Sequence, residues 1–109
     1  MRERHGDGFE AFLRQKITPI HGDITLPLCG VTDEVRDQLR GTMTALVNSS
    51  GVVDFNPPLD YALNTNAFGM KNLVALCQDL GPAGGSGLPM LHTSTCDVAG
   101  DRTGQVDEV

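Results

Sequence analysis

The residues best placed for chemistry are three small hydroxyl side chains that follow a short apolar run near the end of the chain. Met90 and Leu91 are predicted to end a buried strand, and Thr93, Ser94 and Thr95 come directly after it. In an open α/β sheet, ligands and cofactors bind at the carboxyl edge of the strands. The pattern therefore predicts ligand contacts here, and a strand that ends in ordinary turn-forming residues is the alternative.

A second group of small polar residues follows another short apolar run. The range 44–47 is predicted to be a buried parallel strand, and Asn48, Ser49, Ser50 and Gly51 come after it. Small residues at the end of a strand allow a flat ligand or a phosphate group to come close to the backbone. We interpret this stretch as a second ligand loop, with a plain polar turn as the alternative.

A single carboxylate is predicted at the end of a third strand. The range 17–24 has the apolar content of a strand, and Pro19 restricts it to the edge of a sheet because proline has no backbone N–H to donate. Gly22 and Asp23 then form a turn that leaves the Asp23 carboxylate at the carboxyl end of this strand. A solvated turn residue is the alternative for Asp23.

Two helices are predicted between the three strands. The shorter one covers 33–40. The longer one is predicted to start at 56–58, with Asn56 as its N-cap and Pro57 at the first helical position, and it keeps one apolar face as far as Leu80. Asn66 lies inside the longer helix, although asparagine is a poor helix former. Such an asparagine often satisfies a local break in backbone hydrogen bonding, and a tolerated surface residue is the alternative.

The order of these elements predicts an α/β fold. Strand, helix, strand, long helix and strand follow one another, which calls for parallel strands joined by right-handed crossovers. Asp23, the 48–51 loop and the 93–95 hydroxyl run are then expected at one edge of one sheet. Together they are expected to line a single crevice for a small molecule or a dinucleotide.

Composition limits the remaining possibilities. The 109 residues suffice for one small domain or part of one. The formal net charge of -6 argues against a nucleic-acid-binding face. No apolar run is long enough to cross a membrane, and nothing points away from a cytoplasmic location. Cys29, Cys77 and Cys96 are too far apart for a zinc site and odd in number, so we expect no metal and interpret them as reduced packing residues.

Four motifs occur along the chain in a fixed order. They are His-Gly-Asp-Ile-Thr at 21–25, Asn-Ser-Ser-Gly with Asp-Phe at 48–55, Leu-Asn-Thr-Asn-Ala-Phe-Gly at 63–69, and His-Thr-Ser-Thr-Cys-Asp-Val-Ala-Gly at 92–100. The series resembles the extended short-chain dehydrogenase/reductase superfamily and, within it, the fatty acyl-CoA reductase and thioester-reductase branch. The likeness covers about 17–108, which is nearly the whole chain.

This resemblance implies a fold, an activity and a cofactor. The fold is a partial Rossmann-type parallel sheet that supplies strands three to five of the family order, with flanking helices. The activity is the NAD(P)H-dependent reduction of a fatty acyl-CoA or of a carrier-bound acyl thioester, to an aldehyde or an alcohol. The cofactor is accordingly NADP or NAD, with the acyl thioester as the second partner.

The resemblance also implies which residues bind the cofactor. Asp23, followed by Ile24, matches the carboxylate that accepts a hydrogen bond from the adenine amino group. The 48–51 stretch matches the loop that lies along the cofactor, and Thr93 belongs to the same rim. Serines replace the small apolar pair that is usual in this loop.

The catalytic residues are implied in the same way. Asn66 matches the helix asparagine that supports the active site, and Ser94 or Thr95 matches the hydroxyl that hydrogen-bonds the substrate carbonyl. Counting back from 98–100 favours Thr95. Such a hydroxyl stabilises the oxyanion that develops as hydride reaches the carbonyl carbon. Asp97 stands where an aromatic residue is common in the branch.

Two motifs of the superfamily do not occur in the sequence. No Gly-x-x-Gly-x-x-Gly turn follows a first strand, and Tyr61, the only tyrosine, has Thr65 rather than lysine four residues on. We therefore expect 1–109 to be an incomplete NAD(P)-binding reductase domain that is inactive alone. The alternatives are a sugar-nucleotide epimerase or dehydratase of the same superfamily, and a small non-catalytic α/β binding module.

Overall fold

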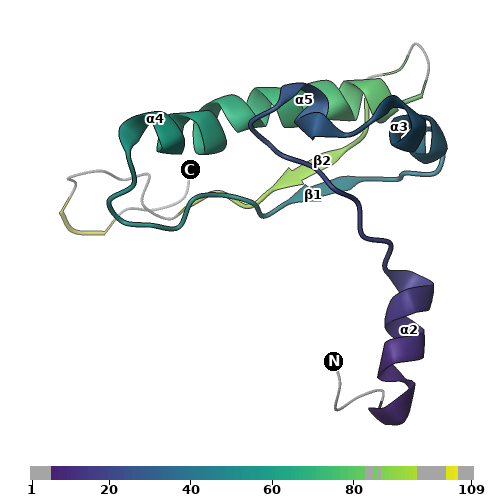
Figure 1. The fold of residues 1–109 in the computed structure, drawn as a ribbon. Helices are drawn as coiled ribbons and strands as arrows, with labels where there is room; N and C mark the ends of the chain where they lie inside the picture. The colour runs from purple at the N-terminus through teal and green to yellow at the C-terminus, as the bar shows by residue number, and fades with distance from the viewer. Residues whose placement is uncertain (1–5, 83–84, 86, 96–102, 106–109) are drawn as a thin grey trace.

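A long helix and a two-stranded parallel sheet beside it form the main body of the protein (Figure 1). The computed structural model describes residues 6–82, 85, 87–95 and 103–105. Strand β1 is Leu46–Asn48 and strand β2 is Met90–His92, paired with Leu46 opposite Met90 and Asn48 opposite His92. The long helix is the crossover between them. The two predicted strands on either side of this helix and their parallel direction are therefore confirmed. Their predicted burial is wrong, because Val47 and Leu91 are 67% and 66% exposed. Among the described residues the two strands pair only with each other, and no further strand or helix covers these side chains.

The long helix has three parts. These are α4 at Leu59–Ala62, a π-helical turn labelled η3 at Leu63–Phe68, and α5 at Gly69–Leu80. Gly81 ends the helix, and its N–H donates to the Cys77 carbonyl over 3.1 Å. The predicted end at Leu80 is confirmed. The predicted start is two residues too early, because the helix begins at Leu59 with Pro58 at its N-cap position and no side-chain cap, so Asn56 is not the N-cap. A proline disfavours the helical conformation of the residue before it, and Pro58 does this to Pro57. The π-helical turn is a feature that the apolar periodicity did not predict.

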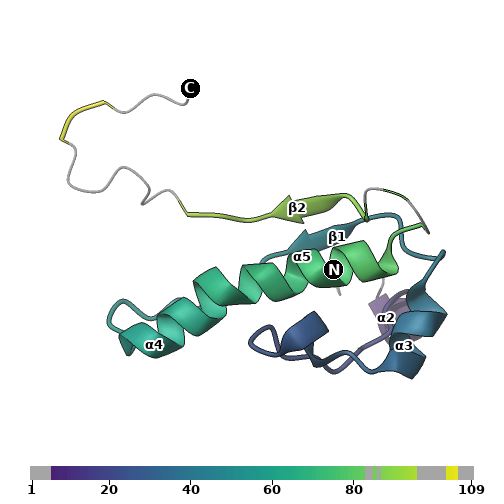
Figure 2. The ribbon, with the colours of Figure 1, turned by 90° about the horizontal axis from the view of Figure 1, so that it is seen from above.

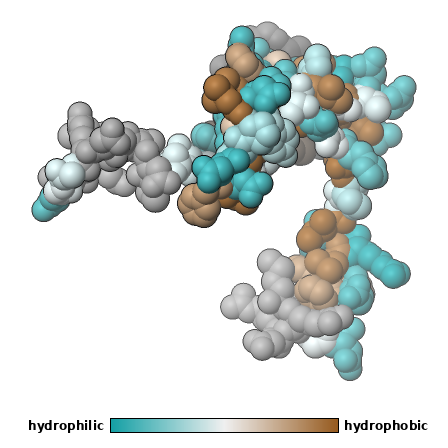
Figure 3. Space-filling model, turned by 60° about the vertical axis from the view of Figure 1, so that its left-hand side comes forward, coloured by the Kyte–Doolittle hydropathy of each residue, from teal (hydrophilic) through white to brown (hydrophobic). Residues whose placement is uncertain are grey.

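The remaining elements are short. They are η1 at Gly6–Gly8, α2 at Phe9–Lys16, η2 at Pro27–Gly30 and α3 at Asp33–Leu39. The helix predicted at 33–40 is thus confirmed as α3. Helix α2 projects from the main body in Figure 1, and none of its residues is buried. Exposed apolar side chains also occur on the surface of the main body, as Figure 3 shows from one side.

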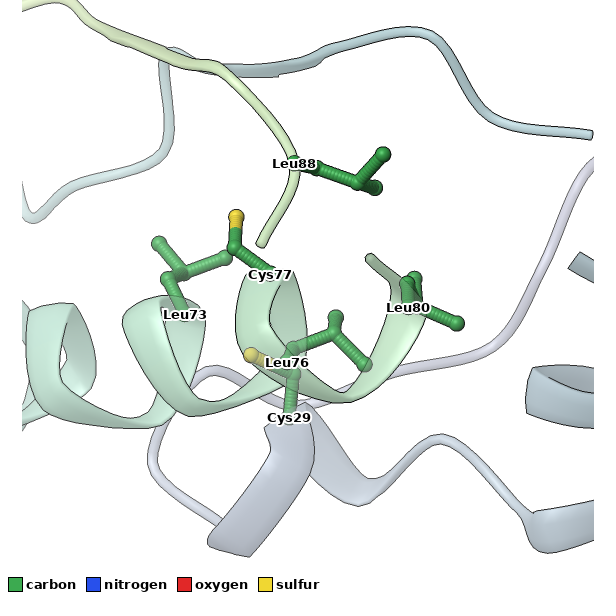
Figure 4. Packing of buried hydrophobic residues seen from close by; sticks show 6 residues of the cluster. All are labelled: Cys29, Leu73, Leu76, Cys77, Leu80 and Leu88. Atoms are coloured by element: carbon green, nitrogen blue, oxygen red, sulfur yellow. The ribbon is translucent and has the colours of Figure 1, made fainter. Parts of the chain in front are cut away.

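The apolar core lies along one face of α5. Its buried members contact one another between α5, η2 and the segment that leads into β2 (Figure 4), and they are Cys29, Leu73, Leu76, Cys77, Leu80 and Leu88. The spacing of the four helical members repeats every three or four residues, which places them on one side of a helix. The Leu88 N–H donates to the Cys77 carbonyl over 2.9 Å, so the chain returns directly onto the helix before β2 begins.

Helix α3 is attached to α5 by charged side chains. Arg36 Nε donates to Asp79 Oδ2 over 3.0 Å, and Arg40 Nη2 donates to both Asp79 oxygens over 2.8 Å. The hydrogen bonds and positive charge of Arg40, joined by those of Arg36, lower the pKa of the Asp79 carboxyl. The carboxylate therefore stays charged at a lower pH than an ordinary aspartate.

The strand predicted at 17–24 is wrong. Residues 17–23 have no regular secondary structure, and β1 and β2 are the only strands among the residues that the structure describes. A strand needs a neighbour that offers matching N–H and C=O groups, and Pro19 removes one donor from this segment. Ile17 and Ile20 are consequently exposed, at 54% and 44% of their surface.

Two of the three cysteines lie in the core, as predicted. Cys29 and Cys77 are buried free thiols, and burial raises the pKa of each. Cys96, with the rest of 96–100, lies outside the described residues. In the described ranges no group of histidine, cysteine and acidic side chains could hold a metal ion. No helix in those ranges has both the length and the apolar character needed to cross a membrane.

Candidate functional site

An open hollow of about 650 Å³ lies at the carboxyl ends of β1 and β2. Its walls are the loop 49–55 after β1, the end of β2 with its continuation at 92–95, and Thr65, Asn66 and Met70 of the long helix. The predicted ligand loop and the predicted hydroxyl run therefore meet at one cavity. Parallel pairing produces this arrangement, because two neighbouring parallel strands end on the same side of the sheet.

Asn48 fixes the bend of the loop after β1 through its side-chain hydrogen bonds. Its side-chain Oδ1 accepts hydrogen bonds from the Ser50 N–H over 3.1 Å and from Ser50 Oγ over 2.6 Å. This is an Asx-turn, in which a side chain replaces a backbone acceptor and bends the chain. Asn48 is only 4% exposed and does not line the hollow, whereas Ser49, Ser50 and Gly51 do.

Asn66 ties the same loop to the long helix. Its Oδ1 accepts a hydrogen bond from the Val52 N–H over 2.8 Å, and its Nδ2 lies 3.5 Å from the Val52 carbonyl oxygen. A Cβ on Gly51 would lie 3.4 Å from Asn66 Oδ1, at the short end of ordinary van der Waals contact, so the loop passes close to the helix here. The prediction that Asn66 satisfies irregular backbone agrees with this geometry, although that backbone belongs to the neighbouring loop.

The hydroxyl run continues the line of β2. The Thr93 N–H donates to the Asn48 carbonyl over 2.8 Å, which extends the pairing of the two strands by one residue. Thr93, Ser94 and Thr95 are exposed and all three line the hollow. Their predicted place at the carboxyl edge of the sheet is confirmed, and their role in catalysis stays a prediction.

Asp23 and Ile24 lie at a different hollow. This second cavity, of about 450 Å³, is lined by Asp23, Ile24, Thr25, Tyr61, Asn64 and Thr65. The Thr25 hydroxyl and N–H donate to Asp23 Oδ1 over 2.7 and 2.8 Å, and these hydrogen bonds lower the pKa of the Asp23 carboxyl. Asp23 is therefore a charged acceptor at neutral pH.

The expectation of one crevice for all three groups is wrong. Thr65 lines both hollows, so the π-helical turn separates Asp23 from the loop and the hydroxyl run. The physical reason is the missing strand at 17–24. The Asn72 side chain donates to the Ile24 carbonyl over 2.8 Å, which holds this segment on the helix rather than in the sheet. Figure 2 shows the two strands on one side of α5 and the short turn η2 on the other.

Two residues of the site were not identified from sequence. His92 lines the first hollow, and its Nδ1 lies 3.0 Å from Asn48 Nδ2. Thr65 has a buried Oγ1, and this is the only buried side-chain nitrogen or oxygen without a hydrogen-bond partner in the described part of the chain. The position of His92 directly before the hydroxyl run was the available signal. No pattern in the sequence indicated Thr65.

Residues 2–109 match the model of the NAD-binding family that is described as Male sterility protein. The chain belongs to this male sterility protein family. Membership confirms the resemblance drawn from the four motifs, and with it the α/β class and the nicotinamide-cofactor family. The numbering of β1 and β2 within a Rossmann sheet stays a prediction.

Several proteins that are similar in sequence to this chain are reductases by name. Fatty acyl-CoA reductase 1 of Arabidopsis thaliana is 26% identical over 99 residues, which are 90% of the chain and 19% of that relative. Alcohol-forming fatty acyl-CoA reductase of Simmondsia chinensis is 25% identical over 109 residues, or 99% of the chain and 21% of that relative. Adenylate-forming reductase Nps9 of Serpula lacrymans is 38% identical over 61 residues, which are 56% of the chain and 6% of that relative. The chain spans about a fifth of the length of these fatty acyl-CoA reductases.

Proposed function

We propose that the chain is part of an NAD(P)H-dependent reductase of fatty acyl-CoA or another acyl thioester, with the hollow at the ends of β1 and β2 as part of its active site. The observation that carries the proposal is the meeting of two features at this hollow. A small-residue bend follows one strand, and a hydroxyl run follows the parallel neighbour. Family membership supports the same reading.

The residues present fit part of a nicotinamide dinucleotide. Gly51 adds no side chain where the loop approaches the helix, and the buried Thr65 Oγ1 is a polar group that a ligand can satisfy. We assign Ser49, Ser50, Gly51 and Thr93 to the side of the hollow that holds the cofactor. When bound, the cofactor supplies a hydride to the substrate.

Asp23 and Ile24 are assigned to the adenine end of the same cofactor. Thr25 donates both of its hydrogen bonds to Oδ1 of the Asp23 carboxylate, and among the described residues Oδ2 accepts none. A carboxylate oxygen accepts hydrogen bonds only, which suits the exocyclic amino group of adenine. Because Thr65 lines both hollows, a ligand that extends past the π-helical turn connects the two sites.

Thr95 is assigned as the donor to the carbonyl oxygen of the acyl thioester, with Ser94 as the neighbouring candidate. A hydroxyl on the rigid continuation of a strand stabilises the oxyanion more in the transition state than the carbonyl in the ground state. Asn66 supports this geometry through the Val52 backbone and acts as a positioning residue. This assignment predicts that the hydroxyl affects turnover more than cofactor binding.

The test uses the full encoded protein with NADPH, NADH and palmitoyl-CoA. We expect palmitoyl-CoA-dependent oxidation of the reduced cofactor, and a loss of roughly 100-fold in kcat for Thr95→Val at unchanged cofactor affinity. Thr44→Val is the matched control, because Thr44 is an exposed threonine just before β1 and away from the hollow. If Ser94→Ala shows the loss instead, the donor is Ser94.

Other outcomes contradict the proposed function. Cofactor oxidation that responds to a sugar nucleotide and not to an acyl-CoA would assign the protein to the epimerase and dehydratase branch. An absence of nicotinamide-cofactor binding in the full encoded protein would favour a non-catalytic binding module.

A further inference from the structure

A buried amide joins the ends of the two strands to the wall of the first hollow. Asn48 Nδ2 lies 3.0 Å from His92 Nδ1 and 3.4 Å from Met70 Sδ, while Asn48 Oδ1 accepts from Ser50. Asn48 is the only buried polar residue that the structure describes, at 4% exposure. Asn48 and His92 are also directly opposed in the strand pairing, so the backbone holds the two side chains at one level.

The orientation of the Asn48 amide follows from its partners. The Ser50 backbone N–H can only donate a hydrogen bond, so the Asn48 atom that faces it must be the carbonyl oxygen. The other end of the amide is then the NH₂ group, which can only donate. No flipped amide satisfies both neighbours, because the oxygen would leave the Ser50 N–H without an acceptor.

This orientation decides the proton position on the His92 ring. A nitrogen that receives a hydrogen bond from an NH₂ group must carry a lone pair, so Nδ1 is unprotonated. The proton of the neutral imidazole then lies on Nε2. Among the described residues, the His92 ring makes its hydrogen bond at Nδ1. The Nε2–H is left to donate to another group, and His92 is an exposed residue that lines the hollow.

We propose that His92 is a ligand-binding residue of this hollow, held by Asn48 as the Nε2–H tautomer so that it donates a hydrogen bond to an oxygen of the bound ligand. The acceptor is a phosphate, carboxamide or thioester carbonyl oxygen. The inference rests on the proposed function for the identity of that ligand as a nicotinamide dinucleotide or an acyl thioester. Asn48 is then a positioning residue, since its own side chain does not line the hollow.

The first experiment reads the tautomer without any ligand. The full encoded protein, labelled with ¹⁵N-histidine, is measured by long-range ¹H–¹⁵N correlation at about pH 8, where imidazole is ordinarily neutral. His92→Gln identifies the His92 signals by their loss. We expect the Nε2–H pattern in the wild type and a change to the Nδ1–H tautomer in Asn48→Asp, because a carboxylate oxygen accepts where the NH₂ group donated.

The second experiment separates the donor from the link to Asn48. The amide nitrogen of His92→Gln reaches the position of Nε2, whereas the shorter side chain of His92→Asn reaches only the position of Nδ1. We expect His92→Gln to keep the wild-type affinity and His92→Asn to weaken one of NADPH, NADH and palmitoyl-CoA by roughly tenfold, the effect of one lost hydrogen bond. The ligand that is weakened identifies the acceptor.

The outcomes distinguish this inference from the proposed function. Wild-type affinity of His92→Asn for all three ligands, or an Nδ1–H ring in the wild type, overturns the inference and leaves the reductase assignment in place. Equal losses in His92→Asn and His92→Gln also overturn it, because only the Gln variant keeps a donor at the position of Nε2, and the two variants must then differ. If the wild type binds none of the three ligands, the proposed function fails, and the ligand role of His92 fails with it.

Discussion

The two halves of the long helix differ in what surrounds them. In α5, Leu76 and Leu80 are 7% and 3% exposed and form the core with η2 and the start of β2. In the first half, Leu59 and Phe68 are 73% and 52% exposed, and this half supplies Thr65 and Asn66 to the first hollow and Tyr61, Asn64 and Thr65 to the second. Burial stabilises one half of the helix, and the other half is left open to ligands.

The boundary between the halves is the π-helical turn. A π-turn displaces the backbone relative to an α-helix and is often found at functional sites. Here it carries Thr65, which lines both hollows, and Asn66, which accepts a hydrogen bond from the loop after β1. Gly69 follows it, and a Cβ there would lie 2.8 Å from Ile24 Cγ1, so the helix and the Asp23 segment meet at this junction. One helix therefore combines an end that stabilises the core, α5, with an end that lines the two hollows, α4 and η3.

The strongest test of this difference is a cavity in the α5 half. We expect Leu80→Ala to lower the free energy of unfolding by about 2 to 5 kcal/mol, because a buried side chain is lost and a void remains. Val74→Ala is the matched control on the same helix, since Val74 is 43% exposed, and its effect should stay below about 1 kcal/mol. Urea denaturation followed by circular dichroism measures both. Equal losses would contradict the assignment of the core to one face.

A smaller effect is expected at the link between α3 and α5. Asp79→Asn removes the charge that Arg36 and Arg40 share, and we expect a loss of about 1 to 2 kcal/mol at neutral pH. The folded protein has a lowered pKa for this carboxyl. The stabilisation is therefore complete above the ordinary aspartate pKa of about 4 and is lost as the pH falls through the lowered value.

The measurement for this link is denaturation as a function of pH. The wild type and Asp79→Asn should converge in stability in strongly acidic solution. Asp33→Asn is the control, because Asp33 pairs with Arg36 from a side chain that is 81% exposed, and its effect should be smaller. A difference between wild type and Asp79→Asn that stays constant down to the lowest pH would show that the link is not electrostatic.

The smallest effect on stability is expected in the π-helical half. Asn66→Ala removes the acceptor of the Val52 N–H, and we expect a loss of about 1 kcal/mol together with faster hydrogen exchange at the Val52 amide. Asn64→Ala is the matched control, because Asn64 is exposed on the same turn and faces the second hollow. Unchanged exchange at Val52 in Asn66→Ala would mean that the loop is held by other contacts.

Local patterns in the sequence were sufficient for much of the fold. The proline pair of 57–58, the repeated apolar positions up to Leu80 and the terminating Gly81 lie in one continuous stretch, so neighbouring residues alone determine where this helix begins and ends. The short apolar runs before Asn48 and before Thr93 likewise identified β1 and β2. The four ordered motifs identified the family, which the match over 2–109 confirms.

Only the tertiary structure decided which of these elements meet. Residues 17–24 have the composition of a strand, but a strand is completed by a partner, and the Asn72 side chain holds this segment against the helix instead. The hydrogen bond between Asn48 and His92 joins residues 44 positions apart, and the one between Asn66 and Val52 joins residues 14 apart. Periodicity and capping act over a few neighbouring residues, whereas the shape of the site depends on these distant pairs, and no local pattern encodes them.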